Sequence, residues 1–88
     1  MTYTYNNKGT CSVRTVVELN DDHTIKSVQV LGGCDGNLKG IGSLVEGMDV
    51  EEVIARVDGI RCGSKGTSCP DQLATALKQA REKLAENA

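Results

Sequence analysis

The chain has 88 residues, a net charge of -2, and neither Phe nor Trp. A chain of this length buries only about 60% of the surface that it exposes when unfolded, so its stability is marginal unless something crosslinks it. Lys and Arg are interspersed with Asp and Glu and form no basic stripe, which argues against nucleic-acid binding.

The first third of the sequence has the pattern of a small antiparallel sheet. Residues 3–5 predict a short edge strand. From residue 11 to 19 apolar and polar residues alternate, which predicts a strand with one mostly apolar face: Cys11, Val13, Thr15, Val17 and Leu19. Turn residues at 20–23 and a second alternating run at 24–31 complete a hairpin, with Val28 and Val30 on one face and Ile25 and Leu31 on the other.

Three helical segments follow. Residues 35–37 supply the start of a helix whose apolar positions recur up to Met48, with Gly47 as the stop. Asp49 caps a second helix, in which Glu52 completes a capping box and which ends at Gly59. The last helix runs from about residue 70 to 84, and residues 86–88 are expected to fray.

These elements predict one α+β domain over residues 1–88, in which a small antiparallel sheet is packed by three helices. The helical positions expected to pack on the apolar face of the hairpin are Leu38, Ile41, Leu44, Val53, Val57, Leu73 and Leu77. No apolar run approaches the ~18 residues of a membrane span, and the polar start of the chain indicates a cytoplasmic protein.

Residues 67–71 combine a helix start with a thiol. Pro70 suits the first helical turn and Asp71 complements the positive end of the helix dipole, so Ser68 or Cys69 is the expected cap. The free N–H groups of a helix start favour a thiolate, which is the form that binds metals and attacks electrophiles. A lone cysteine here would be interpreted as a structural residue beside an ordinary cap, but this chain has four.

The four cysteines are Cys11, Cys34, Cys62 and Cys69, a complete tetrahedral set for zinc or for an iron–sulfur cluster. Their spacing, C-x22-C-x27-C-x6-C, contains no C-x2-C pair and is by itself a weak metal signal. The hairpin returns to its starting edge, which predicts that Cys11 and Cys34 are neighbours. We expect all four thiols to converge on one metal site at one end of the sheet.

Metal ligation or redox chemistry is favoured over two disulfides because the cytoplasm is reducing. Export after removal of a signal segment would reverse that preference.

His23 lies in a polar turn and is interpreted as solvated, and Lys65 is interpreted as an exposed loop residue. Residues 32–37 suggest an anion cradle before a helix, but they lack the spacing of a phosphate fingerprint and Asp35 would repel a phosphate. Glu51 and Glu52 are interpreted as capping and solubilising residues. We identify no catalytic residues and expect no catalysis by this chain alone.

The segments that carry the cysteines resemble the TSCPD family of small four-cysteine proteins. They are GTCS at 9–12, GGCDGNL at 32–38, GI at 40–41, EGM at 46–48 and TSCPDQLA at 67–74, and the resemblance covers nearly the whole chain. The family is similar to a domain near the carboxyl end of adenosylcobalamin-dependent ribonucleoside-diphosphate reductases, which serve DNA synthesis. The resemblance implies a metal-binding accessory or docking module with such a reductase as its protein partner.

A more distant similarity is to the NifU-like iron–sulfur scaffold proteins, and it implies the same strand, hairpin and helix architecture. Cys11, Cys34 and Cys69 would correspond to the three scaffold cysteines. Scaffolds carry an Asp two residues after the first cysteine and a His just before the last, where this chain has Val13 and Ser68. Those groups make a scaffold's cluster labile, so their absence implies a retained site that Cys62 closes as the fourth ligand.

Three functions are therefore weighed. A metal-binding module that holds zinc or an iron–sulfur cluster is favoured. The first alternative is an iron–sulfur assembly scaffold, which would lose its cluster easily and would work with a cysteine desulfurase. The second alternative is a thiol redox partner of a reductase that uses Cys62 and Cys69, which lack the C-x-x-C spacing of redox pairs.

Overall fold

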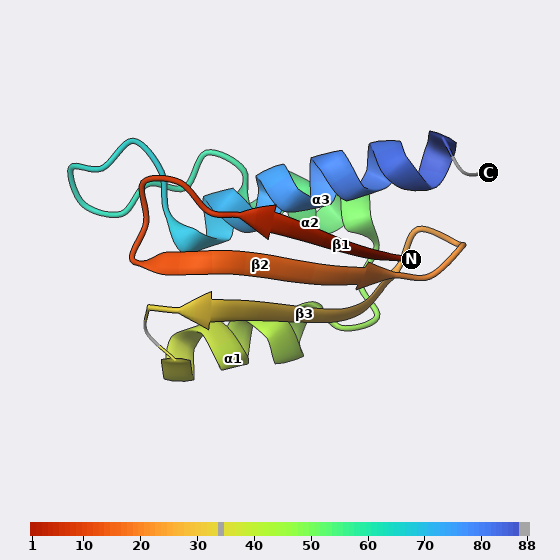
Figure 1. The fold of residues 1–88 in the computed structure, drawn as a ribbon, viewed down its shortest axis with the longest axis horizontal. Coiled ribbons are helices and arrows are strands. Elements are labelled where there is room, and N and C mark those ends of the chain that lie inside the picture. The colour runs from red at the N-terminus through yellow and green to blue at the C-terminus, as the bar shows by residue number, and fades with distance from the viewer. Residues whose placement is uncertain (34, 87–88) are drawn as a thin grey trace.

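The computed structural model describes residues 1–33 and 35–86, which form a three-stranded sheet and three helices (Figure 1). The elements in chain order are β1 (Thr2–Asn6), β2 (Ser12–Leu19), β3 (Ile25–Gly32), α1 (Asp35–Val45), α2 (Val50–Val57) and α3 (Cys69–Glu86). The predicted α+β class is confirmed. Among the described helices, none is both long enough and apolar enough to cross a membrane.

The sheet has the order β1-β2-β3, with both pairs antiparallel. Its register places Tyr3 opposite Val17 and Val17 opposite Val28, and at the far end of the hairpin Ser12 stands opposite Gly32. The predicted hairpin and edge strand are both present, and the edge strand is longer than residues 3–5. Figure 1 shows the chain returning along β3 to the end of the sheet from which β2 starts.

A β-bulge at the start of β2 changes which side chains face the core. The register shifts between Ser12 and Arg14, so Val13 has no partner of its own on β3. A bulge lets two residues oppose one, and the side chains before it exchange faces. Ser12 is accordingly 4% exposed and Val13 is 61% exposed. The predicted apolar face is right from Thr15 onward and wrong before it, where Cys11 and Val13 are both exposed.

A second bulge lies at the turn end of the hairpin. Leu19 pairs with Ile25 and Glu18 pairs with Ser27, so Lys26 is the extra residue. This shift brings Ile25 into the core, where it is 1% exposed, and not onto the face opposite Val28 as the alternation predicts. The cause is again that side chains alternate between the two faces of a strand, so one added residue exchanges the faces of the residues on either side of it.

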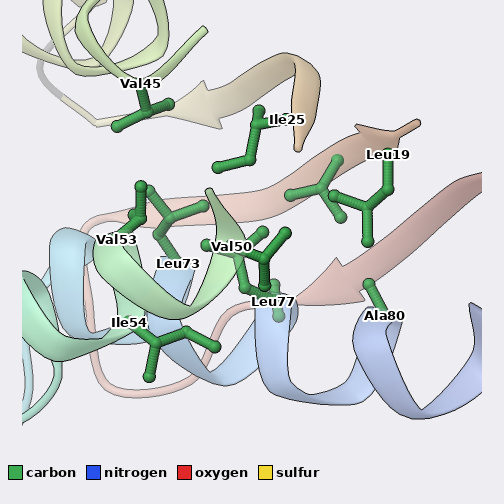
Figure 2. Close-up of a cluster of buried hydrophobic side chains, with 11 residues drawn as sticks. Leu19, Ile25, Val45, Val50, Val53, Ile54, Leu73, Leu77 and Ala80 are labelled. Atoms are coloured by element: carbon green, nitrogen blue, oxygen red, sulfur yellow. The ribbon is translucent and has the colours of Figure 1, made fainter. Parts of the chain in front are cut away.

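The core lies between the sheet and the two later helices. Figure 2 shows side chains from β2, β3, α2 and α3 converging on one another, and Val45 at the end of α1 joins them. The buried residues of this cluster are Val17, Leu19, Ile25, Val45, Val50, Val53, Ile54, Leu73, Ala76, Leu77 and Ala80. Of the predicted packing positions, Leu38 is buried, and Ile41 and Val57 are partly buried. Leu44 is a wrong prediction, because it is 78% exposed.

At the start of α2, a free backbone N–H group is satisfied by backbone pairing and not by a capping box. Asp49 is the N-cap, as predicted, but its side chain makes no capping hydrogen bond. The free N–H of Val50 donates instead to the carbonyl of His23 at 3.0 Å, within a bridge that joins the hairpin turn to the residues before α2. Glu52, the expected partner in the box, pairs with Arg56 on the helix surface.

Helix α1 packs along β3, and Gly42 of this helix lies close to the strand. A Cβ atom on Gly42 would lie 2.6 Å from the carbonyl oxygen of Val28. A side chain there would push the helix away from the strand. Gly40, on the same helix, faces open space. At the other end of the chain α3 continues to Glu86, beyond the predicted end at residue 84, and residues 87–88 lie outside the described part.

The core predicts opposite outcomes for two leucines. Leu77→Ala removes a fully buried side chain and should lower the free energy of unfolding by about 2–5 kcal/mol, because it leaves a cavity. Leu44→Ala removes an exposed one and should change it by less than about 0.5 kcal/mol. Urea unfolding of both variants against the parent protein measures the difference. Equal effects would contradict the helix packing described here.

The two glycines of α1 form a second matched pair. Gly40→Ala should raise the free energy of unfolding by up to about 1 kcal/mol, because Ala is the better helix former and its methyl group meets nothing. Gly42→Ala should lower it by about 1–3 kcal/mol, because its methyl group overlaps the Val28 carbonyl. Thermal unfolding of the two proteins tests the pair, and stabilisation by both substitutions would place α1 farther from β3.

Candidate metal centre

A cleft of about 550 Å³ opens at the end of the sheet where β2 begins. The loop after β1, the first turn of α1, the loop before α3 and the first turn of α3 form its walls, and Figure 1 shows these segments gathered at one end of the molecule. Cys11, Cys62 and Cys69 all line it. The structure thus brings three of the four predicted ligands to one cleft, although they are up to 58 residues apart in sequence.

The position of Cys69 is fixed by the capping of α3. The backbone N–H of Asp71 donates to the Ser68 hydroxyl at 3.2 Å, so Ser68 is the N-cap and Cys69 is the first helical residue. The Ser68 hydroxyl in turn donates to the carbonyl of Ile60 at 2.6 Å. The cap therefore holds the helix start and the preceding loop together, and it keeps the thiol of Cys69 at the positive end of an 18-residue helix.

The sulfur of Cys69 is surrounded by hydrogen-bonding groups. Its Sγ lies 3.0 Å from the hydroxyl of Ser12. Burial raises the pKa of the Cys69 thiol, but hydrogen bonds from Ser12, Cys11 and Thr10 outweigh it and hold the pKa below its ordinary value. Of the described cysteines, Cys69 therefore has a local environment that favours the thiolate.

Cys11 stands beside Cys69 and against the end of β3. Its side chain is one of the groups that lower the pKa of Cys69. On its other side, a Cβ atom on Gly33 would lie only 3.0 Å from Cys11 Sγ, and Gly33 has a φ of 72°, a conformation that side chains disfavour. The residue before Cys34 thus packs on the Cys11 sulfur. Cys34 itself lies outside the described residues.

Cys62 belongs to an exposed loop that is closed on itself. Its N–H donates to the carbonyl of Thr67 at 3.1 Å, and its own carbonyl accepts from the N–H of Lys65 at 3.0 Å. The side chain lines the cleft but is exposed. Within residues 1–33 and 35–86, no three Cys, His, Asp or Glu side chains lie close enough together to hold one metal ion. Cys62 therefore lines the same cleft as Cys11 and Cys69 without completing a three-ligand group among the described residues.

A network of buried polar side chains lies behind the Cys69 sulfur. Thr15, which is fully buried, donates to the Asn7 carbonyl oxygen at 2.8 Å, and the Asn7 amide nitrogen donates to the Ser12 hydroxyl at 2.7 Å. Gln72 accepts from the N–H of Lys8 at 2.9 Å and links the loop after β1 to α3. Every buried side-chain nitrogen or oxygen in the described part of the chain has a hydrogen-bond partner. This end of the sheet is therefore held by satisfied polar contacts.

The opposite wall of the cleft is apolar. It is formed by Leu38, Ile41 and Leu44, which follow one face of α1. This placement gives the physical reason for the wrong prediction at Leu44: helical spacing identifies a continuous apolar stripe but not whether a second element covers all of it. On α1, Val45 therefore packs in the core, whereas the neighbouring Leu44 lines the cleft.

Sequence reasoning missed the residues that support the thiols. Ser12 alternates with the apolar positions of its strand, which predicts an outward-facing side chain, and the sequence indicates no role for Asn7 or Gln72. No local pattern distinguishes them from ordinary surface residues. The bulge at Val13, which the alternation does not reveal, is what turns Ser12 inward. His23 lies in the hairpin turn at the other end of β2.

Asp71 ties the loop before α3 to the helix, and this contact can be tested. Its carboxylate accepts hydrogen bonds from the Thr67 hydroxyl and from the N–H of Gly59, and these, in that order, lower its pKa. A lowered carboxyl pKa stabilises the fold above the ordinary pKa, and the contribution is lost as the pH falls through the lowered value. The contact should therefore persist from neutral to mildly acidic pH.

We predict that Asp71→Ala loosens this loop. Because the carboxylate is largely solvated, the free energy that holds the loop closed should fall by about 1 kcal/mol or less. This corresponds to loop opening that is favoured by up to about fivefold. Trypsin can cut the loop at Arg61 and Lys65, so the rate of cleavage there reports its opening. Asp21→Ala, in the exposed hairpin turn, is the control. Cleavage at the same rate in both variants would show that Asp71 does not hold the loop.

Comparison with known proteins places this chain in a family. A family model of the TSCPD domain matches residues 1–81. That range includes all four cysteines and all three strands, together with α1, α2 and most of α3. No curated protein and no solved structure matched the chain. Because the match covers nearly the whole sequence, this protein belongs to the TSCPD family.

Proposed function

We propose that this TSCPD protein is a metal-binding module whose four cysteines, Cys11, Cys34, Cys62 and Cys69, hold one zinc ion or one iron–sulfur cluster. One observation supports the proposal above the others. Cys11 just before β2, Cys62 in the loop before α3 and Cys69 at the start of α3 all line one cleft, and the Cys11 side chain helps to lower the pKa of Cys69. Thiols that line one cleft from such distant parts of the sequence, in a small domain, are placed where a metal could crosslink the sheet to the helix.

The chemistry of the donor set fits a soft metal. Cys69 is held toward its thiolate form by hydrogen bonds and by the helix start, and thiolate is the form that ligates. Gly36 and Asn37, in the first turn of α1, line the same cleft, so a second helix N-terminus faces the site. Two such helix starts would partly offset the net negative charge that four thiolates leave around a divalent ion. The metal would supply a crosslink between segments that are far apart in the sequence.

The size of the core supports a structural role for this crosslink. The buried cluster consists of Val, Leu, Ile and Ala, with the two tyrosines only packed against it. Structural zinc supplies about 10–16 kcal/mol of apparent binding energy in zinc-finger peptides, which is comparable with the whole stability of a typical domain at about 5–15 kcal/mol. A small aliphatic core with a thiolate site at one end would therefore depend on the metal for much of its stability.

The proposal extends to an accessory or docking role for a ribonucleoside-diphosphate reductase. This part rests on the resemblance of the family to a domain near the carboxyl end of the adenosylcobalamin-dependent enzymes. The chain is too short to contain a reductase's catalytic barrel, so any catalysis would belong to the partner.

An iron–sulfur assembly scaffold is the second candidate, and one observation favours it. Cys62 is exposed and forms no three-ligand group with the other described cysteines, which is the arrangement of an open site. The residues at two positions count against a scaffold. Val13 stands where a scaffold's Asp would be, and Ser68, in place of the scaffold's His, is used as the α3 cap. Neither position can supply the groups that make a scaffold's cluster labile.

Elemental analysis and absorption of the anaerobically purified chain decide between the candidates. One zinc per chain in a colourless protein, or a brown protein whose cluster survives gel filtration, supports the retained site. A cluster that passes readily to an apo-acceptor supports the scaffold. A chain with no bound metal and reactive thiols contradicts both and favours the thiol redox alternative.

Single substitutions then identify the ligands. Cys11→Ala, Cys34→Ala, Cys62→Ala and Cys69→Ala should each lower the metal content below one per chain. Ser64→Ala, in the same exposed loop as Cys62, should leave it unchanged and is the matched control. Full metal content in Cys62→Ala alone would leave a three-cysteine site with an open position, as in a scaffold.

We predict that removal of the metal unfolds the protein. Excess EDTA at neutral pH should abolish native amide chemical-shift dispersion and the cooperative thermal transition, because the remaining core is small. Readdition of the metal under reducing conditions should restore both. A dispersed spectrum that persists after the metal is shown to be gone would mean that the hydrophobic core folds unaided.

A further inference from the structure

We infer that Ser12 is a positioning residue for the metal site: its hydroxyl donates a hydrogen bond to the Cys69 sulfur and fixes that thiolate as the anchor ligand. The inference rests on the proposed function and adds a residue to it. The oxygen of Ser12 lies 3.0 Å from Cys69 Sγ, across a sequence separation of 57 residues.

The position of Ser12 is set by the backbone. The bulge at Val13 turns the Ser12 side chain inward at the end of β2, where it is 4% exposed. Its backbone pairs with Gly32 on β3, so the hairpin fixes the position of its Cα. Ser12 therefore stands on a rigid element, whereas Cys69 begins a helix that packs against the same strand. A hydrogen bond between them joins the two elements at the site.

The surrounding hydrogen bonds determine which way the Ser12 hydroxyl points. Thr15 donates to the Asn7 oxygen, and the Asn7 amide donates to the Ser12 oxygen. Ser12 is thus an acceptor from the sheet side, and its single hydrogen is left for another partner. The chain of donors runs from Thr15 through Asn7 to Ser12, and the next atom in line is the Cys69 sulfur.

One competing acceptor exists for that hydrogen. The Thr10 hydroxyl lies 3.0 Å from the Ser12 oxygen, and it also donates to the Ser12 carbonyl at 3.1 Å. A thiolate accepts hydrogen bonds without donating any, and a bond to a charged acceptor is stronger than one to a neutral hydroxyl. The Ser12 hydrogen therefore goes to the sulfur when Cys69 is a thiolate, as it is when it binds a metal.

Such a bond changes the properties of the ligand and not only its place. Donation to the sulfur lowers the energy of its lone pairs and restricts the orientation in which they face the metal. Groups that support metal ligands in this way change metal affinity by about 10–100-fold when they are removed. Ser12 should therefore slow metal loss and raise the energy of sulfur-to-metal charge transfer.

The test uses the full chain loaded with Co²⁺ under anaerobic conditions. In Ser12→Ala the sulfur-to-cobalt charge-transfer band should move to longer wavelength, and transfer of Co²⁺ to EDTA should be at least about 10-fold faster. Ser12→Thr keeps the hydroxyl and should restore most of both properties. Ser43→Ala, the same substitution at an exposed position on α1, should match the parent protein. Far-ultraviolet circular dichroism establishes that each variant is folded.

The outcomes separate this inference from the proposed function. A folded Ser12→Ala that binds Co²⁺ with the parent band and release rate overturns the role of Ser12 and leaves the metal module standing. A parent chain that takes up no Co²⁺ overturns both. If Ser12→Ala does not fold, Thr15→Val removes the first donor of the chain while keeping the side-chain shape. It should shift the band in the same direction by a smaller amount, and an unchanged band would overturn the inference.

Discussion

The antiparallel pairing of β2 with β3 is the constraint on which the site depends. It places Ser12 opposite Gly32 at one end of the sheet, so the residues that enter β2 and those that leave β3 share one edge. Gly33 then packs against the sulfur of Cys11, and α1 begins at Asp35, a few residues beyond the strand. A shift of the register by one residue would invert the faces of one strand relative to the other and separate these groups. The position of the cleft is thus a consequence of hairpin geometry.

The second constraint is the direction of α3. Leu73, Leu77 and Ala80 bury its apolar stripe against the sheet and α2, and this packing leaves the amino end of the helix at the cleft. Ser68 caps that end, and Cys69 follows directly. Buried packing along the helix therefore controls where the thiol stands. The Gln72 side chain completes the connection. Its oxygen accepts a hydrogen bond from the N–H of Lys8, and its amide nitrogen donates one to the Thr67 hydroxyl.

The two ends of the molecule are stabilised by different interactions. The middle and the hairpin-turn end contain aliphatic side chains in contact, as Figure 2 shows, with Val50 and Leu77 near the centre. The cleft end contains a polar network around Ser12 and the cysteines, with the apolar wall of α1 facing it across the cleft. A hydrophobic core adds stability in proportion to the area that it buries, whereas a polar network adds mainly geometric definition. The cysteines and their hydrogen-bonding partners therefore lie where the aliphatic core ends.

The sequence by itself determined the elements and their order. Alternation identified β2 and β3, glycines followed the ends of α1 and α2, and TSCPD marked the start of α3, because these signals depend on neighbours within a few residues. It also identified the hairpin and, from it, the edge of the sheet to which Cys11 belongs. The family itself was predictable for the same reason, since its motifs lie in short continuous segments.

Only the tertiary structure decided which side chains meet. The bulges at Val13 and Lys26 exchanged faces that a strict period of two assigns otherwise, which exposed Cys11 and buried Ser12. The contact of Ser12 with Cys69, the exposed position of Cys62 in the cleft and the exposure of Leu44 beside it likewise follow from how whole elements pack. A local pattern states which face of an element is apolar. It does not contain the relative placement of elements, because that is fixed by contacts between residues far apart in the chain.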